Sequence, residues 1–258
     1  MSPRGASTAL RASYESIYAA QGIQDQQQFY AWIIRLIRAR RDWRVLDVAC
    51  GEGGLLAAAQ ARGLAPYGID ISSEALRRAQ GASSKAVLAQ ASAEALPWAD
   101  ASFDCVTCLG SLENFLHPTR ALAEIRRVLR TDGVLCAMMP NRFWLGDVLQ
   151  VMRGREEQPP FQYVERTATA RQWQAFLEGA GFIVDRRYGY TKVSPLLRGG
   201  KLRSLRKYLL TRALRSVSPP ALAWSIVYIA HKGRPQPRQR GWWWRAERFG
   251  DEARGTGD

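Results

Sequence analysis

Three glycines and an aspartate in the first quarter of the chain have the types and spacing of a ligand-binding turn. Asp47 ends an apolar run, and Gly51, Gly53 and Gly54 follow it before the next apolar segment. Glycines let a ligand approach the backbone without a Cβ in the way, and the first turn of a helix offers unpaired N–H groups. The pattern predicts a strand, a tight turn and a helix whose N-terminus faces a bound ligand.

A second acidic residue completes this chemistry. Asp70 stands 19 residues after Gly51, at the end of the apolar run 65–69. A carboxylate at a strand tip can accept hydrogen bonds from both hydroxyls of a ribose, each worth roughly 1.5–3 kcal/mol because it is charge-assisted. An isolated aspartate would more simply cap a helix or a turn. Together with the glycine turn, Asp70 favours binding of a nucleoside.

The glycine spacing argues against a dinucleotide. Counted from Gly51, the third glycine of the G-x-G-x-x-G pattern falls on Leu56, and Glu52 would set a carboxylate beside a pyrophosphate of like charge. A nucleoside ligand that carries an ammonium and a sulfonium would tolerate acidic neighbours. The sequence therefore favours such a cationic ligand.

The elements that must position these residues alternate along the chain. Expected strands cover 44–49, 65–69, 86–90, 103–109, 134–139, 182–190 and 222–231, and expected helices cover 55–61, 73–80, 118–129, 142–154 and 168–180. This alternation predicts an α/β fold with a doubly wound, mostly parallel sheet and helices on both faces. Ligands of such sheets lie beyond the carboxyl ends of the strands, where Gly51, Asp70, Ser92 and Leu109 would converge.

From Tyr14 to about Lys232 the sequence resembles the class I S-adenosylmethionine-dependent methyltransferases, specifically their small-molecule group. The matching segments are 44–56, 67–72, 93–98, 102–104, 110–115 and 127–133. The resemblance implies S-adenosylmethionine as cofactor and a Rossmann-like sheet of seven strands with a final antiparallel strand. It implies cofactor contacts at Asp47, Ala49, Gly51, Gly53, Asp70, Ile71, Ser92, Ala93 and Leu109.

Three positions depart from the usual residues of that group. Ser92 stands where an aspartate commonly meets the adenine amino group, and Ala49 replaces a common glycine. Thr131 and Asp132 replace a Pro-Gly turn, which we expect to survive because Asp tolerates the left-handed conformation.

Methyl transfer is an in-line displacement in which positioning and desolvation supply much of the catalysis, so a protein base is optional. For a hydroxyl or amine acceptor His117 is the candidate base, because it follows the fourth strand and imidazole takes up a proton near neutral pH. The alternative is that His117 only starts the helix at Pro118. Glu113 and Asn114 are candidates for orienting the acceptor.

Two other functions stay open at this stage. The basic charge suits a nucleic-acid methyltransferase, but the position after the fourth strand reads Leu109-Gly110-Ser111-Leu112 and lacks an Asn/Asp-Pro-Pro-Tyr type motif for handling a base. Specific nucleic-acid binding is therefore disfavoured. The other alternative is a protein that binds S-adenosylmethionine without catalysis. The residues themselves name neither the acceptor, which is expected to be a small-molecule or lipid-linked compound, nor the oligomeric state.

The net charge of +14 is concentrated in one part of the 258-residue chain. Residues 1–185 hold 20 basic and 19 acidic residues, whereas 186–246 hold 15 basic and none acidic. Within this basic region, 194–217 is predicted to form an amphipathic helix. Its apolar side carries Leu202, Leu205, Leu209, Ala213 and Val217. Two interpretations stay open: peripheral contact with an anionic membrane, or a wall of the acceptor pocket.

The chain divides into three expected parts: an N-terminal helical lid at 1–40, a methyltransferase domain at 41–233 with a basic insertion at about 191–220, and a disordered basic and aromatic tail at 234–258.

The four cysteines lie in or beside expected core strands, which indicates reduced thiols, and Cys105 and Cys108 alone do not predict a metal site. No apolar signal segment stands at the N-terminus, so we expect a cytoplasmic protein, with peripheral membrane contact if 194–217 provides it.

Overall fold

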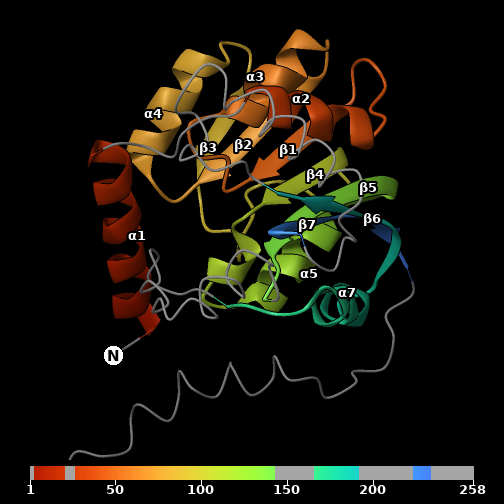
Figure 1. Ribbon diagram of the computed structural model, residues 1–258. Coiled ribbons are helices and arrows are strands. Elements are labelled where there is room, and N and C mark those ends of the chain that lie inside the picture. The colour runs from red at the N-terminus through yellow and green to blue at the C-terminus, as the bar shows by residue number, and fades with distance from the viewer. Residues whose placement is uncertain (1–2, 21–26, 143–165, 192–222, 234–258) are drawn as a thin grey trace, which may run out of the picture.

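The computed structural model describes residues 3–20, 27–142, 166–191 and 223–233. Its centre is a seven-stranded sheet in the order β3-β2-β1-β4-β5-β7-β6 (Figure 1). The strands are β1 (Arg44–Val48), β2 (Ala65–Asp70), β3 (Val87–Gln90), β4 (Phe103–Leu109), β5 (Leu129–Pro140), β6 (Phe182–Tyr190) and β7 (Ser225–Lys232). The first five strands are parallel, and β7 is antiparallel to both β5 and β6. The predicted fold class is confirmed.

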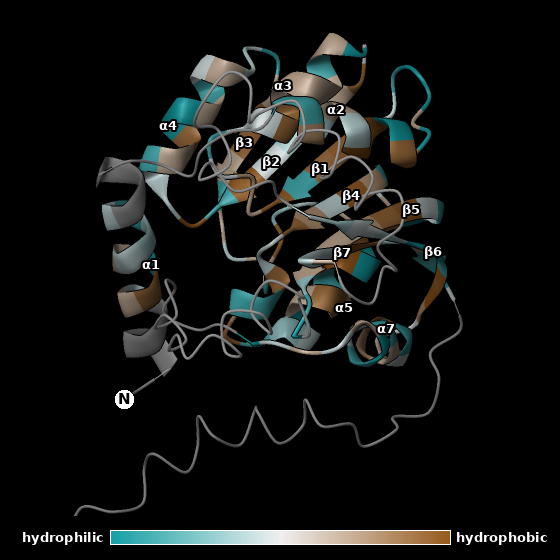
Figure 2. Cartoon of the chain, viewed as in Figure 1, coloured by the Kyte–Doolittle hydropathy of each residue, from teal (hydrophilic) through white to brown (hydrophobic). Residues whose placement is uncertain are grey.

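Helices cover both faces of this sheet. The helices in the described part of the chain are α1 (Pro3–Ala20), α2 (Gln27–Leu36), α3 (Gly54–Ala61), α4 (Ser73–Ala82), α5 (Pro118–Val128) and α7 (Ala170–Gly179), with a short 3₁₀ turn η1 (Leu112–Asn114). Residues of α2 and α3 pack in one core cluster, and residues of α5 and α7 pack in another on the opposite face. Figure 2 shows apolar residues gathered along the strands between these layers. The arrangement leaves the carboxyl ends of the parallel strands as a shared edge.

Within the expected helical lid at 1–40, the described residues form two helices with different surroundings. Ile33 of α2 is fully buried and packs in the same cluster as Leu55 of α3 and Val45 of β1. α2 is thus a layer of the core. α1 instead stands beside α4 at the side of the molecule (Figure 1).

One local expectation was wrong. β5 begins at Leu129, five residues earlier than predicted, and Asp132 lies inside this strand rather than in a left-handed turn. Two contacts explain the difference: Leu129 pairs with Phe103 in the sheet, and the Ser102 N–H donates to the Val128 carbonyl at 2.7 Å. Sheet pairing at this point ends α5 at Val128, one residue before the predicted helix end.

Several sequence predictions lie outside the described residues: the helix at 142–154 beyond its first residue, most of the basic insertion at 191–220, the amphipathic segment 194–217, and the tail 234–258. Among the residues that are described, no helix is long and apolar enough to cross a membrane.

Candidate functional site

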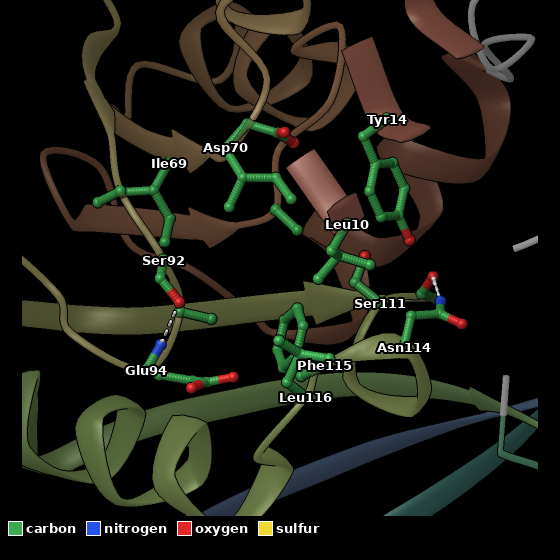
Figure 3. Close-up of a pocket in the computed structure, with 15 residues that line it drawn as sticks. Leu10, Tyr14, Ile69, Asp70, Ser92, Glu94, Ser111, Asn114, Phe115 and Leu116 are labelled. Atoms are coloured by element: carbon green, nitrogen blue, oxygen red, sulfur yellow. Dashed lines mark hydrogen bonds between the residues drawn. The ribbon is translucent and has the colours of Figure 1, made fainter. Parts of the chain in front are cut away.

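A cleft lies at the shared edge where β1, β2 and β4 end, and α1 forms part of its wall (Figure 3). Its empty space is about 630 Å³ when the open solvent at its mouth is included. The lining residues are Leu10, Tyr14, Ala49, Ile69, Asp70, Ile71, Ala91, Ser92, Ala93, Glu94, Gly110, Ser111, Asn114, Phe115 and Leu116. Among the candidate site residues, the structure brings Ala49, Asp70, Ile71, Ser92, Ala93 and Asn114 together in the lining, whereas Gly51 and Leu109 are not part of it.

Asp70 is the charged group that β2 delivers to this cleft. Its carboxylate is 5% exposed, and each oxygen accepts one backbone hydrogen bond, Oδ2 from the Gly51 N–H and Oδ1 from the Ser72 N–H, both at 2.9 Å. Burial raises the pKa of Asp70, while these N–H groups oppose the rise. A carboxylate oxygen has capacity for a second hydrogen bond, so each can still accept one from a ligand hydroxyl in the cleft.

The glycine turn has the conformation that its composition requires. Gly51 and Gly53 have φ of 51° and 79°, in the left-handed region, and Ala49 has φ of 61°. A Cβ on Gly53 would lie 2.9 Å from the Cα of Ala79, so this residue also permits close packing of α4 on the turn. Ala49 lines the cleft, whereas Gly51 and Gly53 shape its edge through the backbone.

Asp47 is the penultimate residue of β1 and lies beneath the turn. It is 5% exposed, and its Oδ1 accepts a hydrogen bond from the Thr107 hydroxyl of β4 at 2.5 Å. Burial raises the pKa of Asp47 to about 7; the Asp70 charge adds to the rise and the Thr107 hydrogen bond opposes it. Asp47 is not among the cleft-lining residues, so its position is that of a support behind the turn.

Glu52, expected to repel a pyrophosphate, lies in an ion pair. Its carboxylate accepts a hydrogen bond from Nη1 of Arg78 in α4 at 2.6 Å. Because Arg78 pairs with Glu52, only the glycine spacing disfavours a dinucleotide.

The loop after β3 supplies the other end of the cleft. Ser92 and Glu94 are labelled there in Figure 3, and the Ser92 hydroxyl accepts a hydrogen bond from the Glu94 N–H at 3.2 Å. The Glu94 carboxylate in turn accepts one from the His117 N–H at 3.0 Å. Glu94 belongs to the segment 93–98 that carries the family resemblance, but its residue type and spacing predicted no role for it in the site.

The candidate catalytic residues have different positions around η1. Asn114 lines the cleft and is 3% exposed; its Nδ2 donates to the Gly110 carbonyl at 3.4 Å, and its Oδ1 has no hydrogen-bond partner within the described part of the chain. Glu113 is 6% exposed and does not line the cleft. His117 is exposed and is the N-cap residue of α5, outside the lining. Leu109 packs with the cluster of α2 and α3.

Arg166, which the sequence did not single out, fixes this loop. Its guanidinium donates to the carbonyls of Glu113, Phe115 and Leu116 at 3.1, 2.6 and 3.3 Å. Since Phe115 and Leu116 line the cleft, Arg166 holds one of its walls from behind.

The sheet order and the cleft at the carboxyl ends of its strands are those of a Rossmann-like methyltransferase fold. Residues 46–137 match the family whose description is "Methyltransferase domain", and the resemblance expected from the sequence is confirmed. The carboxyl edge of the sheet, with Asp70 and the glycine turn, falls within the matched residues.

Two curated relatives illustrate the sequence similarity. The chain is 37% identical over 113 residues to the ubiquinone/menaquinone biosynthesis C-methyltransferase UbiE of Ralstonia pickettii, which covers 41% of this chain and 46% of the relative. It is 32% identical over 121 residues to the malonyl-[acyl-carrier protein] O-methyltransferase of Enterobacter lignolyticus, covering 47% and 48%. The chain thus spans about half the length of the curated relatives it matches.

Solved structures extend the similarity over more of the chain. The 1,6-didemethyltoxoflavin-N1-methyltransferase of Burkholderia thailandensis, solved with S-adenosylhomocysteine, has a TM-score of 0.61 at 18% identity and covers 90% of this chain and 91% of its own. The cyclase SpnF has a TM-score of 0.55 at 22% identity and covers 81% and 82%. At these identities the similarity shows the fold alone.

Proposed function

We propose that this protein transfers a methyl group from S-adenosylmethionine to a small-molecule or lipid-linked acceptor. The observation that carries the proposal is Asp70, whose buried carboxylate faces the cleft with one backbone hydrogen bond on each oxygen. This geometry suits two ribose hydroxyls. S-adenosylmethionine, when bound, supplies a methyl group on a sulfonium leaving group.

The remaining lining residues fit the donor and divide the cleft between adenosine and acceptor. Ile71 and Ala93 offer apolar contact for a planar base. The Ser92 hydroxyl can donate a hydrogen bond to the polar edge of the base or accept one from it. Tyr14 and Asn114 lie at the end away from Ser92 and Glu94 (Figure 3). We place the acceptor at that end.

Asn114 is the residue we assign to orienting the acceptor. Its Nδ2 faces the Gly110 carbonyl, which fixes Oδ1 as the atom that is still able to accept a hydrogen bond. A buried amide oxygen without a partner costs about 1–3 kcal/mol, and an N–H or O–H group of the acceptor would remove that cost. An acceptor with such a donor beside its nucleophilic atom is therefore favoured. No protein base is needed for this assignment.

Titration calorimetry with S-adenosylhomocysteine tests the donor site. Asp70→Ala removes both ribose contacts, so we expect the Kd to rise by about 10-fold or more, which corresponds to roughly 1.4 kcal/mol. Asp132→Ala, which changes an aspartate that is 84% exposed in β5, is the matched control and should bind like wild type. Unchanged affinity in a folded Asp70→Ala protein would contradict the site assignment.

Turnover separates catalysis from binding alone. Cell extracts incubated with the enzyme and isotopically methyl-labelled donor should yield a labelled product in the water-soluble or the lipid phase. Donor binding without labelling of any compound would favour the non-catalytic alternative. Labelled nucleic acid that persists at moderate salt would favour the nucleic-acid alternative, because charge-driven binding weakens steeply with salt.

We further propose that the basic segment 194–217, which lies outside the described residues, draws the protein to anionic membranes. Each basic side chain contributes on the order of 1 kcal/mol near such a surface. We expect flotation with anionic but not neutral vesicles, and its loss when Lys201, Arg203, Lys207, Arg212 and Arg215 become Gln. A control variant with the same charge change has Gln at five other exposed basic positions and should still float. These positions are Arg38, Arg40, Arg41, Arg62 and Lys85. Wild-type protein that fails to float at low salt would overturn this proposal.

A further inference from the structure

A single carboxylate of α1 connects this helix to the edge of the cleft. Glu15 accepts four hydrogen bonds from the first turn of α4: from the Ser72 hydroxyl at 2.8 Å, the Ser73 N–H at 2.8 Å, the Ser73 hydroxyl at 2.9 Å and the Glu74 N–H at 3.2 Å. All four donors belong to three consecutive residues, so the contact is multidentate.

These hydrogen bonds complete the N-terminus of α4. The first N–H groups of a helix have no partner within the helix itself. The Ser72 hydroxyl accepts from the Ala75 N–H at 3.1 Å, and Glu15 accepts from the two preceding residues, so the cap of α4 is shared between its own serine and a residue of another helix. A negative charge at this position is also favoured by the dipole of α4.

The charge of Glu15 agrees with this role. Burial acts to raise the pKa of Glu15, but the hydrogen bonds from Ser73, Ser72 and Glu74 outweigh it and lower the pKa below its ordinary value. The groups that face it are these donors, Arg11 at 4.0 Å on its own helix, and Asp70, whose pKa it helps to raise. Glu15 is therefore ionised at neutral pH.

The capped turn is also the turn that holds Asp70. The Ser72 N–H donates to Asp70 on the inner side, while the Ser72 hydroxyl donates to Glu15 on the outer side. Two residues of α1 line the cleft: Tyr14, which directly precedes Glu15, and Leu10, which is five residues before Glu15. Figure 3 shows Tyr14 on the side of the cleft where Asn114 lies. Glu15 thus links α1, which forms a wall of the cleft, to the turn that holds Asp70, the residue expected to bind the ribose.

We propose that Glu15 is a positioning residue that holds α1 across the cleft, so that Leu10 and Tyr14 form a wall of the cleft and slow the release of the nucleoside. The proposal rests on the donor site described above. It assigns Glu15 no contact with the donor or the acceptor. Its effect is transmitted through the position of α1.

The test compares Glu15→Ala with Ser16→Ala in the full-length protein. Both changes introduce alanine, the best helix former, into the same turn of α1, so neither lowers its helical propensity. Ser16 is exposed and its hydroxyl donates only to the Ser13 carbonyl within the described residues, which makes it a matched control. A third variant, Glu15→Gln, keeps the side-chain shape but replaces one carboxylate oxygen with an amide N–H₂ group. This group cannot accept the hydrogen bonds that the first turn of α4 donates.

Hydrogen exchange of the ligand-free protein measures the contact itself. We expect amides in 8–16 and 73–75 to exchange at least 10-fold faster in Glu15→Ala and Glu15→Gln than in wild type, with Ser16→Ala unchanged. Unchanged exchange in both Glu15 variants would overturn the proposal, whether or not the protein binds a nucleoside.

Surface plasmon resonance with S-adenosylhomocysteine measures the consequence. Both Glu15 variants should show about a 10-fold faster dissociation rate with a nearly unchanged association rate, and Ser16→Ala should match wild type. Faster exchange together with wild-type dissociation would overturn the positioning role. Failure of wild-type protein to bind would instead refute the donor site, because the exchange result is obtained without ligand.

Discussion

Ala49 has a backbone conformation that its side chain disfavours. At φ of 61° an L-residue with a Cβ is strained by roughly 1–2 kcal/mol, and glycine is not. Ala49 ends the run from β1 into the glycine turn and lines the cleft, so the strain is stored at the edge of the site. The methyltransferases that this sequence resembles commonly have glycine at this position. In this chain Ala49 is therefore expected to lower the free energy of unfolding.

We expect Ala49→Gly to stabilise the protein. Relief of the strain is offset by the greater freedom of glycine in the unfolded chain, roughly 0.5–1 kcal/mol, so the free energy of unfolding should rise by up to about 1 kcal/mol. Urea denaturation measures the change. Ala101→Gly, at φ of 51° in an exposed turn, should behave in the same way, and a loss of stability in both variants would refute the explanation by strain.

Among the elements, those fixed by local pattern could be predicted and those fixed by distant contacts could not. β2, β4 and β6 end where apolar periodicity and turn residues place their ends. The start of β5 could not be predicted, because Leu129 enters the sheet through its pairing with Phe103 of β4. Local signals favour helix up to Leu129, and sheet pairing instead places Leu129 in β5.

The site divides in the same way. Gly51 and Asp70 could be found because their chemistry is carried by residue type and by a spacing that one βαβ unit imposes. Glu15 and Arg166 could not, since their partners lie 58 and 53 residues away and only the fold brings them together. For His117 the sequence left two roles open, a base or the start of a helix, and the structure places its backbone at the start of α5.

The two helices at the N-terminus show how an element's neighbours set its role. α2 is amphipathic and buries Ile33 and Ile34 against α3 and the sheet. α1 is held by polar contacts from Glu15 to α4 and offers Leu10 and Tyr14 to the cleft. Among the described side chains α1 has one buried apolar residue, Leu10, whereas α2 buries Ile33 and Ile34 and packs in the core. A helix with less buried apolar surface opens at lower free energy, which suits α1 to admit a ligand.

The stability of the whole molecule should depend on pH through Asp47. The folded protein holds a proton on Asp47 up to about pH 7, whereas the unfolded chain loses it near pH 4. Between these values the folded state binds more protons, so the stability contributed by this group is full at low pH and is lost as the pH rises through 7. Asp70, whose pKa is also raised by burial, acts in the same direction.

We therefore expect the free energy of unfolding to be higher at pH 5 than at pH 8, with a contribution from Asp47 of roughly 2–3 kcal/mol. The carboxylates of lowered pKa, Glu15, Glu74 and Glu124, act in the opposite direction but mainly below pH 5. Urea denaturation of wild type and Asp47→Asn at both pH values measures the effect. Asparagine keeps an oxygen that can accept the hydrogen bond from Thr107 and cannot titrate, so the difference between pH 5 and pH 8 should shrink in this variant. An equal difference in both proteins would show that Asp47 is already ionised at pH 5.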